Sequence, residues 1–193
     1  MSSAPHGTAV VMMDFQNTIV AMIAEPARSA VLQRAQHVLA AARARGVPVL
    51  HVVVQFRPGH PEVASANLIF AGIRAAGLLV EGTEGAAIHA ALAPRADEPV
   101  VVKRRVGAFG TTDLDALLRA RGVRRLVLCG LVTSGVVLST VRAAADLDYG
   151  LVVVGDACAD ADDEVHRVLT SKVLARQASV VAADQVEALL AQA

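Results

Sequence analysis

The chain has 193 residues, with 18 lysines and arginines balancing 18 aspartates and glutamates, and 54% of its residues are hydrophobic. This size and composition are typical of one globular domain, so we expect residues 1–193 to form a single domain. The absence of net charge argues against nucleic acid or anionic lipid as partners and favours a small molecule. The apolar runs are strand-length, much shorter than the roughly 18 residues of a membrane span.

The N-terminus and the cysteines indicate the compartment. Residues 1–8 lack the basic region of a signal or transit peptide, so we expect a cytoplasmic location. Cys129 and Cys158 are too few for a disulfide framework or a Cys-x-x-Cys metal site, and we expect buried thiols. We expect no cofactor, because the sequence contains no glycine-rich nucleotide-binding motif.

Continuous apolar runs alternate with segments of helical periodicity along the chain. The expected strands span residues 8–13, 47–54, 100–102, 125–131, 151–154 and 178–181, and the expected helices span 27–45, 113–121, 135–147, 165–176 and the segment from 184 onward. Gly46 and Gly122 each stand between a helix and a strand, as is typical of a left-handed helix cap. Strands that are apolar on both faces predict a parallel sheet covered on both sides, which is a three-layer α/β/α fold.

The segment from Phe56 to Pro99 is less regular and contains several prolines and glycines. We interpret it as a long excursion that carries short helices. Long excursions in compact domains are often binding loops.

Polar residues stand where three of the expected strands end. Ligands of open parallel sheets bind at the carboxyl ends of the strands. Asp14 ends the first apolar run, Lys103 ends the third, and residues 130–135 connect the fourth to its helix. They offer a carboxylate, an ammonium group and N–H groups that suit an oxyanion. Each also has a purely structural interpretation: Asp14 as a cap, Lys103 as part of a solvated basic rim, and Thr133 with Ser134 as a helix N-cap.

Taken together, these segments resemble the isochorismatase-like hydrolases, also called the cysteine hydrolase family, over nearly the entire chain. The matching segments are VMMDFQN at 11–17, VKRRVGAF at 102–109 with TDL at 112–114, LCGLVTSG at 128–135 and VVGDAC at 153–158. The resemblance implies a Rossmann-like, six-stranded parallel sheet with helices on both faces. It also implies a homodimer or higher homo-oligomer.

In the amidases of this family an Asp, a Lys and a Cys form the catalytic triad. The resemblance assigns the first two to Asp14 and Lys103. The position of the Cys, three residues after the Thr of the Gly-x-x-Thr turn, is occupied by Val136, and valine cannot act as a nucleophile.

No nearby group replaces the missing nucleophile easily. Cys129 lies within the strand before the turn and Cys158 follows a different strand. Ser134 and Ser139 are displaced along the chain from the family's position, which would spoil the attack geometry.

The resemblance contains a second chemical route, because the isochorismatases of the family also lack the Cys. Their Asp is thought to protonate a vinyl ether, after which water captures the oxocarbenium ion. Asp14 and Lys103 suffice for this route, provided that burial raises the pKa of Asp14 more than Lys103 lowers it. Val136 is bulkier than the residue expected there in a true isochorismatase, which leaves isochorismate itself open as the substrate.

Further site residues follow from the same resemblance and from position at the strand ends. Backbone groups of Leu131, Val132 and Val136 would hold an oxyanion, with a cis peptide bond between Leu131 and Val132. Candidate substrate contacts are Phe15, Gln16, Gln55, Arg57, Arg105, Phe109, Thr133 and Ser134. Solvated loops and core packing are the plain alternatives for these side chains. No metal is expected, because His51 and His60 alone do not close the zinc site of the family's nicotinamidases.

The preferred hypothesis is therefore a hydrolase that uses Asp14 and Lys103 without a covalent intermediate. One alternative is a ligand-binding or regulatory protein that lost catalysis together with the Cys. Another is a hydrolase that uses different residues, such as Ser134 or Ser139.

Overall fold

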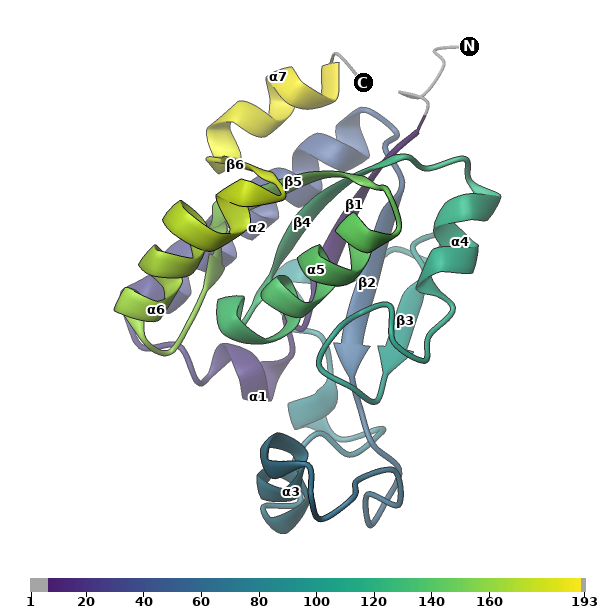
Figure 1. The fold of residues 1–193 in the computed structure, drawn as a ribbon, viewed down its shortest axis with the longest axis vertical. Helices are drawn as coiled ribbons and strands as arrows, with labels where there is room; N and C mark the ends of the chain where they lie inside the picture. Colours follow the sequence, from purple (N-terminus) through teal and green to yellow (C-terminus); the bar gives the residue numbers. More distant parts are fainter. Residues whose placement is uncertain (1–6, 192–193) are drawn as a thin grey trace.

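The computed structural model describes residues 7–191, which form one six-stranded parallel sheet flanked by helices (Figure 1). The strands are β1 (Thr8–Met13), β2 (Val49–Val54), β3 (Val100–Lys103), β4 (Arg125–Leu131), β5 (Gly150–Ala159) and β6 (Ser179–Val181). Their order in the sheet is β3-β2-β1-β4-β5-β6. From β1 the chain continues to β2 and β3 on one side of the sheet, and from β4 it continues to β5 and β6 on the other side. The strand order therefore reverses between β1 and β4, and the crevice that binds ligands in such sheets lies at the carboxyl ends of these two strands.

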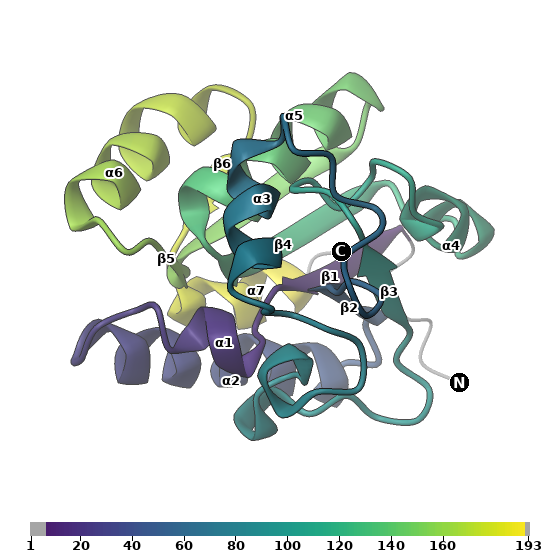
Figure 2. The same ribbon diagram turned by 90° about the horizontal axis from the view of Figure 1, so that it is seen from below.

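Helices cover both faces of the sheet, which confirms the three-layer α/β/α fold (Figure 2). On one face lie α2 (Ala27–Ala44) and α7 (Val186–Ala191), and on the other lie α4 (Leu114–Ala120), α5 (Leu138–Asp146) and α6 (Asp163–Val168). Along β1, Val10 and Met12 join the apolar core under α2, whereas Val11 and Met13 join the core under α5. Both faces of the strand are buried, and its sequence is therefore continuously apolar.

Several elements differ in extent from the sequence-based expectation. The expected helix 135–147 is divided, because a π-helical turn at Thr133–Val137 precedes α5. The expected helix 165–176 likewise consists of α6 followed by a π-helical turn and a 3-10 turn. The strand β5 continues to Ala159, with a register shift against β4 between Leu128 and Gly130.

The strand β3 corrects the expectation that every strand is buried on both faces. It lies at the edge of the sheet, where Val100 and Val102 are 44% and 38% exposed. Val101 and Lys103, on the opposite face, are buried. An apolar run such as residues 100–102 therefore does not show by itself that both faces of a strand are covered.

The excursion between β2 and β3 projects beyond the carboxyl ends of the strands (Figures 1 and 2). It carries α3 (Leu68–Ala75) and two 3-10 turns at Glu84–Ala86 and Ala90–Leu92. A β-bridge between Phe56 and Val80 closes the segment 57–79, which contains α3. The ring of Phe70, on α3, packs against that of Phe56 with centroids 5.2 Å apart.

Arg104, which directly follows β3, fastens the excursion to the sheet. Its guanidinium pairs with Glu81 and lies 3.4 Å from the Glu62 carboxylate. It also donates a hydrogen bond to the carbonyl oxygen of Gln55, at the end of β2. One side chain therefore connects two points of the excursion with the end of β2.

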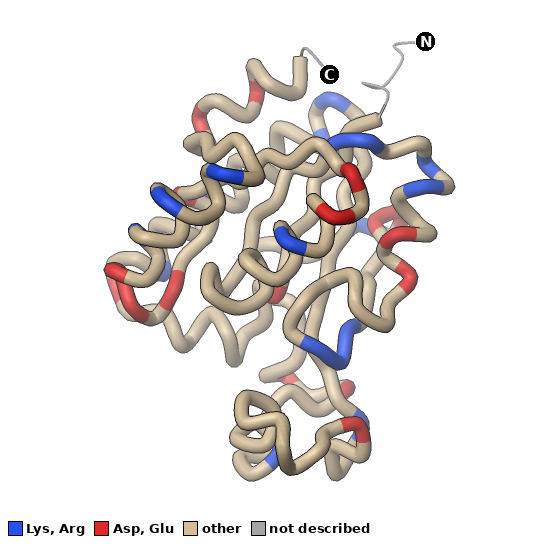
Figure 3. The backbone as a smooth tube through the Cα atoms, in the orientation of Figure 1, with Lys and Arg blue, Asp and Glu red and all other residues tan. Residues whose placement is uncertain are grey.

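Charged residues of both signs are interspersed along the helices and loops (Figure 3). Within residues 7–191, no helix is both long enough and apolar enough to cross a membrane.

Candidate active site

A cavity of about 460 Å³ lies at the carboxyl ends of β1, β2, β3 and β4, and α3 forms one of its walls. A short helix that the sequence did not predict, α1 (Asn17–Val20), contributes to a second wall. The lining residues are Asp14, Thr18, Ile19, Met22, Val54, Ile69, Phe70, Gly72, Ile73, Leu78, Leu79, Lys103, Val106, Leu131, Val132, Ser134, Gly135 and Val136.

Asp14 directly follows β1, and the backbone changes direction at this residue. Its backbone has φ of 58°, in the left-handed region that aspartate tolerates better than most residues. Its side chain is buried, and the residue as a whole is 4% exposed. Oδ2 lies 2.8 Å from Nζ of Lys103, whereas Oδ1 has no hydrogen-bond partner among the described residues.

Lys103 is the last residue of β3 and is only 1% exposed. Its ammonium group also donates a hydrogen bond of 3.1 Å to the carbonyl oxygen of Arg105. The parallel pairing of β3 with β2 and of β2 with β1 brings the ends of β1 and β3 to the same edge of the sheet. The sheet topology therefore brings together two residues that are far apart in sequence.

The pKa of Asp14 is raised from 3.8 to about 6. Burial of the carboxyl group is the largest cause, and it outweighs the charge and the hydrogen bond of Lys103, which lower the pKa. A carboxyl group with such a pKa can hold a proton close to neutral pH and release it to a reacting group.

The turn after β4 forms another wall of the cavity. The peptide bond between Leu131 and Val132 is cis, as the family resemblance implied. Val136, in the π-helical turn, lines the cavity, and the backbone N–H of Ser134 donates to Oδ2 of Asp160 at 2.7 Å. The Thr133 hydroxyl is buried and lies 2.8 Å from Nδ1 of His166.

The cavity unites six of the sequence-predicted site residues, which are Asp14, Lys103, Leu131, Val132, Ser134 and Val136. The others, Phe15, Gln16, Gln55, Arg57, Arg105, Phe109 and Thr133, are not among the residues that line it. Phe15 is buried in the core under α2, and Phe109 packs against Tyr149 with ring centroids 5.9 Å apart.

Gln16 forms a structural connection in the protein interior. Its amide nitrogen donates to the carbonyl oxygens of Val54 and Ala86, at 2.9 and 2.7 Å. Its amide oxygen accepts a hydrogen bond of 2.8 Å from the N–H of Val54. Gln55 also donates to the Ala86 carbonyl oxygen, at 3.2 Å. Both amides therefore hold the excursion to the strand ends.

The two arginines expected at the substrate have other partners. Arg57 is exposed and pairs with Glu62. Arg105 is exposed, and its guanidinium donates to the carbonyl oxygen of Arg104.

The cysteines and histidines singled out in the sequence also lie away from the cavity. Cys129 and Cys158 are buried, and burial raises the pKa of the Cys158 thiol to about 12 and that of Cys129 well above its usual value. His51 lies 3.2 Å from the Glu98 carboxylate, and Nε2 of His60 lies 2.8 Å from the carbonyl oxygen of Leu78.

Sequence reasoning did not identify the apolar walls. Ile69, Phe70 and Ile73 of α3 line the cavity, as do Leu78 and Leu79 directly after it. The signal that was available is the helical spacing of apolar residues 69, 70 and 73 inside a segment otherwise rich in loop residues.

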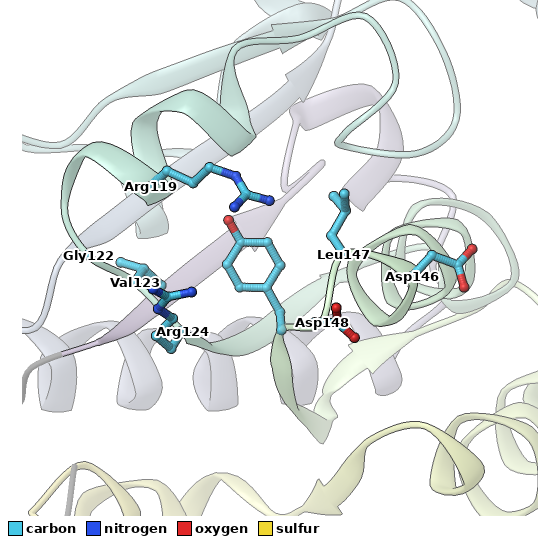
Figure 4. A pocket seen from close by; sticks show the side chains of 8 residues that line it. Arg119, Gly122, Val123, Arg124, Asp146, Leu147 and Asp148 are labelled. Atoms are coloured by element: carbon cyan, nitrogen blue, oxygen red, sulfur yellow. The ribbon is translucent and has the colours of Figure 1, made fainter.

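A second pocket, of about 450 Å³, lies near the junction of α4 with β4 and of α5 with β5 (Figure 4). Arg119, Arg124 and Tyr149 line it together with Asp146 and Asp148. Charges of both signs surround this pocket, and the buried Asp14–Lys103 pair lies elsewhere. The cavity at the Asp14–Lys103 pair is therefore the candidate active site.

A parallel sheet with a buried carboxylate–ammonium pair in a cavity at its carboxyl edge defines an α/β protein with a candidate catalytic site, and comparisons with known proteins specify the family. Residues 8–185 match the isochorismatase domain. The chain is 34% identical over 181 residues to the uncharacterized isochorismatase family protein YecD of Escherichia coli O157:H7, covering 93% of this chain and 94% of that protein. It is 32% identical over 161 residues to the maleamate amidohydrolase of Pseudomonas putida, covering 82% and 75%.

The fold agrees with these matches. An isochorismatase family protein from Burkholderia thailandensis superposes with a TM-score of 0.83 at 29% identity, covering 98% of this chain and 100% of that chain. The protein therefore belongs to the isochorismatase family, whose relatives include amidohydrolases that act on small molecules.

Proposed function

We propose that this family member is a hydrolase of a small molecule that works by noncovalent acid–base catalysis, with Asp14 and Lys103 as the catalytic residues. The observation that carries the proposal is the buried Asp14 carboxyl group, which lines the cavity 2.8 Å from the Lys103 ammonium group and has a pKa of about 6. Val136 supports a route without a covalent intermediate, because its side chain lines the cavity where the family resemblance places the nucleophilic Cys.

The proposed reaction begins with transfer of the Asp14 proton to the substrate. With a vinyl ether, the proton goes to the terminal carbon of the double bond, whose electron pair forms the new C–H bond and leaves an oxocarbenium ion. Water then adds to this ion, and its proton returns to Asp14. The hemiacetal that results collapses to an aldehyde or ketone and an alcohol. Lys103 stabilises the Asp14 carboxylate during the cycle, since opposite charges in a buried site attract strongly. With a related C–O or C–N bond, the Asp14 proton would instead go to the leaving oxygen or nitrogen, water would add to the carbon as that bond breaks, and the proton lost by the water would return to Asp14.

The test is hydrolysis of a panel that contains isochorismate and neutral alkyl vinyl ethers, with ethyl and butyl vinyl ether as members. Products are pyruvate and acetaldehyde, each measured by reduction with NADH and the appropriate dehydrogenase. In deuterium oxide the methyl group of acetaldehyde should gain one deuterium. Asp14→Asn should lower turnover by at least about a hundredfold, the contribution of a general acid. Asp113→Asn, an exposed aspartate outside the cavity, is the matched control. Turnover that survives Asp14→Asn would contradict the proposal.

A catalytically inactive member that binds a ligand or regulates a partner is the second candidate function. It is favoured by the side chains that line the cavity, because within residues 7–191 they include hydroxyls but no thiol. Under this hypothesis Val136→Cys restores amidase activity, whereas the unmodified protein hydrolyses no member of the panel. Ser134 also lines the cavity, and a covalent adduct mapped to Ser134 or Ser139 would favour a different set of catalytic residues.

We further propose that the protein is a homodimer or a higher homo-oligomer and needs no metal or cofactor for this chemistry. Support for self-association comes from apolar side chains left exposed on two elements. Leu68 on α3 is 86% exposed, and Val100 and Val102 lie on an edge strand. Exposed apolar groups and free strand edges favour association between protein chains.

A further inference from the structure

We propose that the cavity binds a neutral, largely apolar substrate with a single polar reacting group, and that it discriminates against substrates that carry a carboxylate. The proposal rests on the proposed function, because it specifies the substrate class of the same site. It differs from what the maleamate amidohydrolase would suggest, since maleamate carries a carboxylate.

The walls of the cavity are almost entirely apolar. Among the described residues that line it, only Asp14, Thr18, Lys103 and Ser134 have polar side chains. The remaining walls come from aliphatic side chains, the thioether side chain of Met22, the ring of Phe70 and two glycines. Such walls favour hydrocarbon groups, which leave water when they bind.

The charges in the cavity compensate each other. Asp14 and Lys103 form an ion pair of 2.8 Å, and no other charged side chain of the described residues lines the cavity. Above the Asp14 pKa of about 6 the carboxyl group is ionised, and the pair then has no net charge left for a substrate carboxylate. When Asp14 carries its proton, Lys103 is an uncompensated cation, so the discrimination belongs to the ionised state and the binding below is measured at pH 8. A carboxylate that leaves water without a cation or several hydrogen-bond donors binds poorly.

The nearby arginines are committed to other groups. Arg104 pairs with Glu62 and Glu81, and Arg57 pairs with Glu62. Arg74 donates to the carbonyl oxygen of Val63 at 2.9 Å, and Arg105 donates to that of Arg104 at 2.6 Å. None of these guanidinium groups belongs to a residue that lines the cavity, so the part of the chain that the structure describes provides no bidentate carboxylate clamp there.

The mouth of the cavity is also apolar. Met22, Ile69 and Leu78 line the cavity and yet are 56%, 62% and 40% exposed. Figure 3 shows that α3, at the end of the molecule beyond the strands, carries almost no charge, and Arg74 is its one charged residue. Exposed apolar patches of this kind commonly mark binding grooves for apolar groups.

The first experiment measures binding by isothermal titration calorimetry, which needs no turnover. The probes are butanamide, hexanamide and octanamide, together with adipamate, which is hexanamide with its terminal methyl replaced by a carboxylate. The dissociation constant should fall about fourfold for each added methylene. Adipamate should bind at least about tenfold more weakly than hexanamide, because its carboxylate loses water without gaining a cation.

Three results would overturn the proposal. The first is affinity that does not depend on chain length, and the second is no binding by any amide. The third is tighter binding of adipamate than of hexanamide. If that tighter binding disappeared in Arg105→Ala, it would identify Arg105 as a carboxylate clamp.

A charge-introducing variant tests the same inference from the protein side. Ile73→Arg places a guanidinium in the wall formed by α3, and it should reverse the preference so that adipamate binds more tightly than hexanamide. The matched control is Leu68→Arg on the same helix, which is 86% exposed and does not line the cavity. The control should keep the preference of the unmodified protein, and circular dichroism confirms that both variants fold.

The two proposals fail separately. Turnover that persists in Asp14→Asn would overturn the catalytic role of Asp14 and leave the binding series intact. A carboxylate preference in the binding series would overturn the substrate class and leave the acid catalyst intact.

Discussion

At the scale of single residues, the proposed chemistry depends on a competition between burial and charge at Asp14. Burial raises the pKa of its carboxyl group and Lys103 lowers it, with a value of about 6 as the result. If the protonated form is the catalyst, activity should fall as the pH rises through this value, by about tenfold per pH unit above it. The measurement is kcat/KM from pH 4.5 to 8.5. A rate that instead rises through pH 6 would assign the active form to the carboxylate.

Replacement of Lys103 tests the origin of this pKa. In Lys103→Met the charge and the hydrogen bond that lower the pKa are lost, whereas the burial that raises it remains. The pKa of Asp14 should therefore rise further, on the order of one to two units. Titration of the labelled Asp14 carboxyl carbon by NMR measures the change. An unchanged pKa would show that the two side chains are not coupled.

Gln16 provides a residue-scale prediction about stability. Gln16→Ala removes the side-chain partner of the buried N–H and carbonyl groups of Val54 and leaves the Ala86 carbonyl oxygen with Gln55 alone as a side-chain donor among the described residues. The free energy of unfolding should therefore fall by about 2–4 kcal/mol. Urea denaturation measures the loss. Gln36→Ala is the control, because Gln36 is exposed and makes one hydrogen bond to Ala91, and it should change stability by less than about 0.5 kcal/mol. Equal losses in both variants would contradict the structural role of Gln16.

The sequence located Asp14 and Lys103 because a polar residue that ends an apolar strand can be recognised without coordinates. It did not reveal which influence prevails at Asp14, since that depends on the depth of burial and on a distance of 2.8 Å. For Gln16 the sequence predicted a substrate contact, whereas in the structure its amide connects buried backbone groups and does not line the cavity. A glutamine next to a site residue fits a substrate contact and a buried connection equally well in sequence.

At the scale of elements, the strands and most helices could be predicted because their apolar periodicity is strong. The boundaries of β1 and β4 agree with the expected 8–13 and 125–131. The excursion was predicted as an irregular segment with short helices, which the structure confirms. The position of α3 was not predicted, because this helix is short and its apolar residues line a cavity or are exposed to solvent. The exposed face of β3 was missed because a sequence does not show which strand lies at the edge.

Because Arg104 attaches the excursion to the sheet, its replacement should affect the local stability of α3. Arg104→Ala removes its contacts with Glu62, Glu81 and Gln55, so α3 should open more often. Amide hydrogen exchange in residues 68–75 should become faster by about tenfold, as expected for a weakened local unit, while exchange in β1 and β4 stays unchanged. Arg57→Ala is the control, because Arg57 is more exposed and pairs with Glu62 alone. Equally fast exchange in both variants would show that Arg104 does not hold the excursion.

At the scale of the whole molecule, self-association can be measured directly. Light scattering after size exclusion should give a mass of at least twice the 20.0 kDa of one chain. If the edge strand takes part, Val100→Lys should lower that mass, since a lysine on an edge strand opposes pairing with another chain. A mass of one chain for the unmodified protein would contradict the proposed oligomer.

The β-bridge between Phe56 and Val80 has a consequence for how such a fold diversifies. It joins the two ends of the segment 57–79, so this segment can change in length or sequence while the strands keep their places. The Asp14–Lys103 pair lies outside the segment, whereas Ile69, Phe70 and Ile73 lie within it. Replacement of segment 57–79 alone would thus change one wall of the cavity and leave Asp14 and Lys103 in place. We expect that exchange of this segment between related proteins would change the preferred substrate and not the type of reaction.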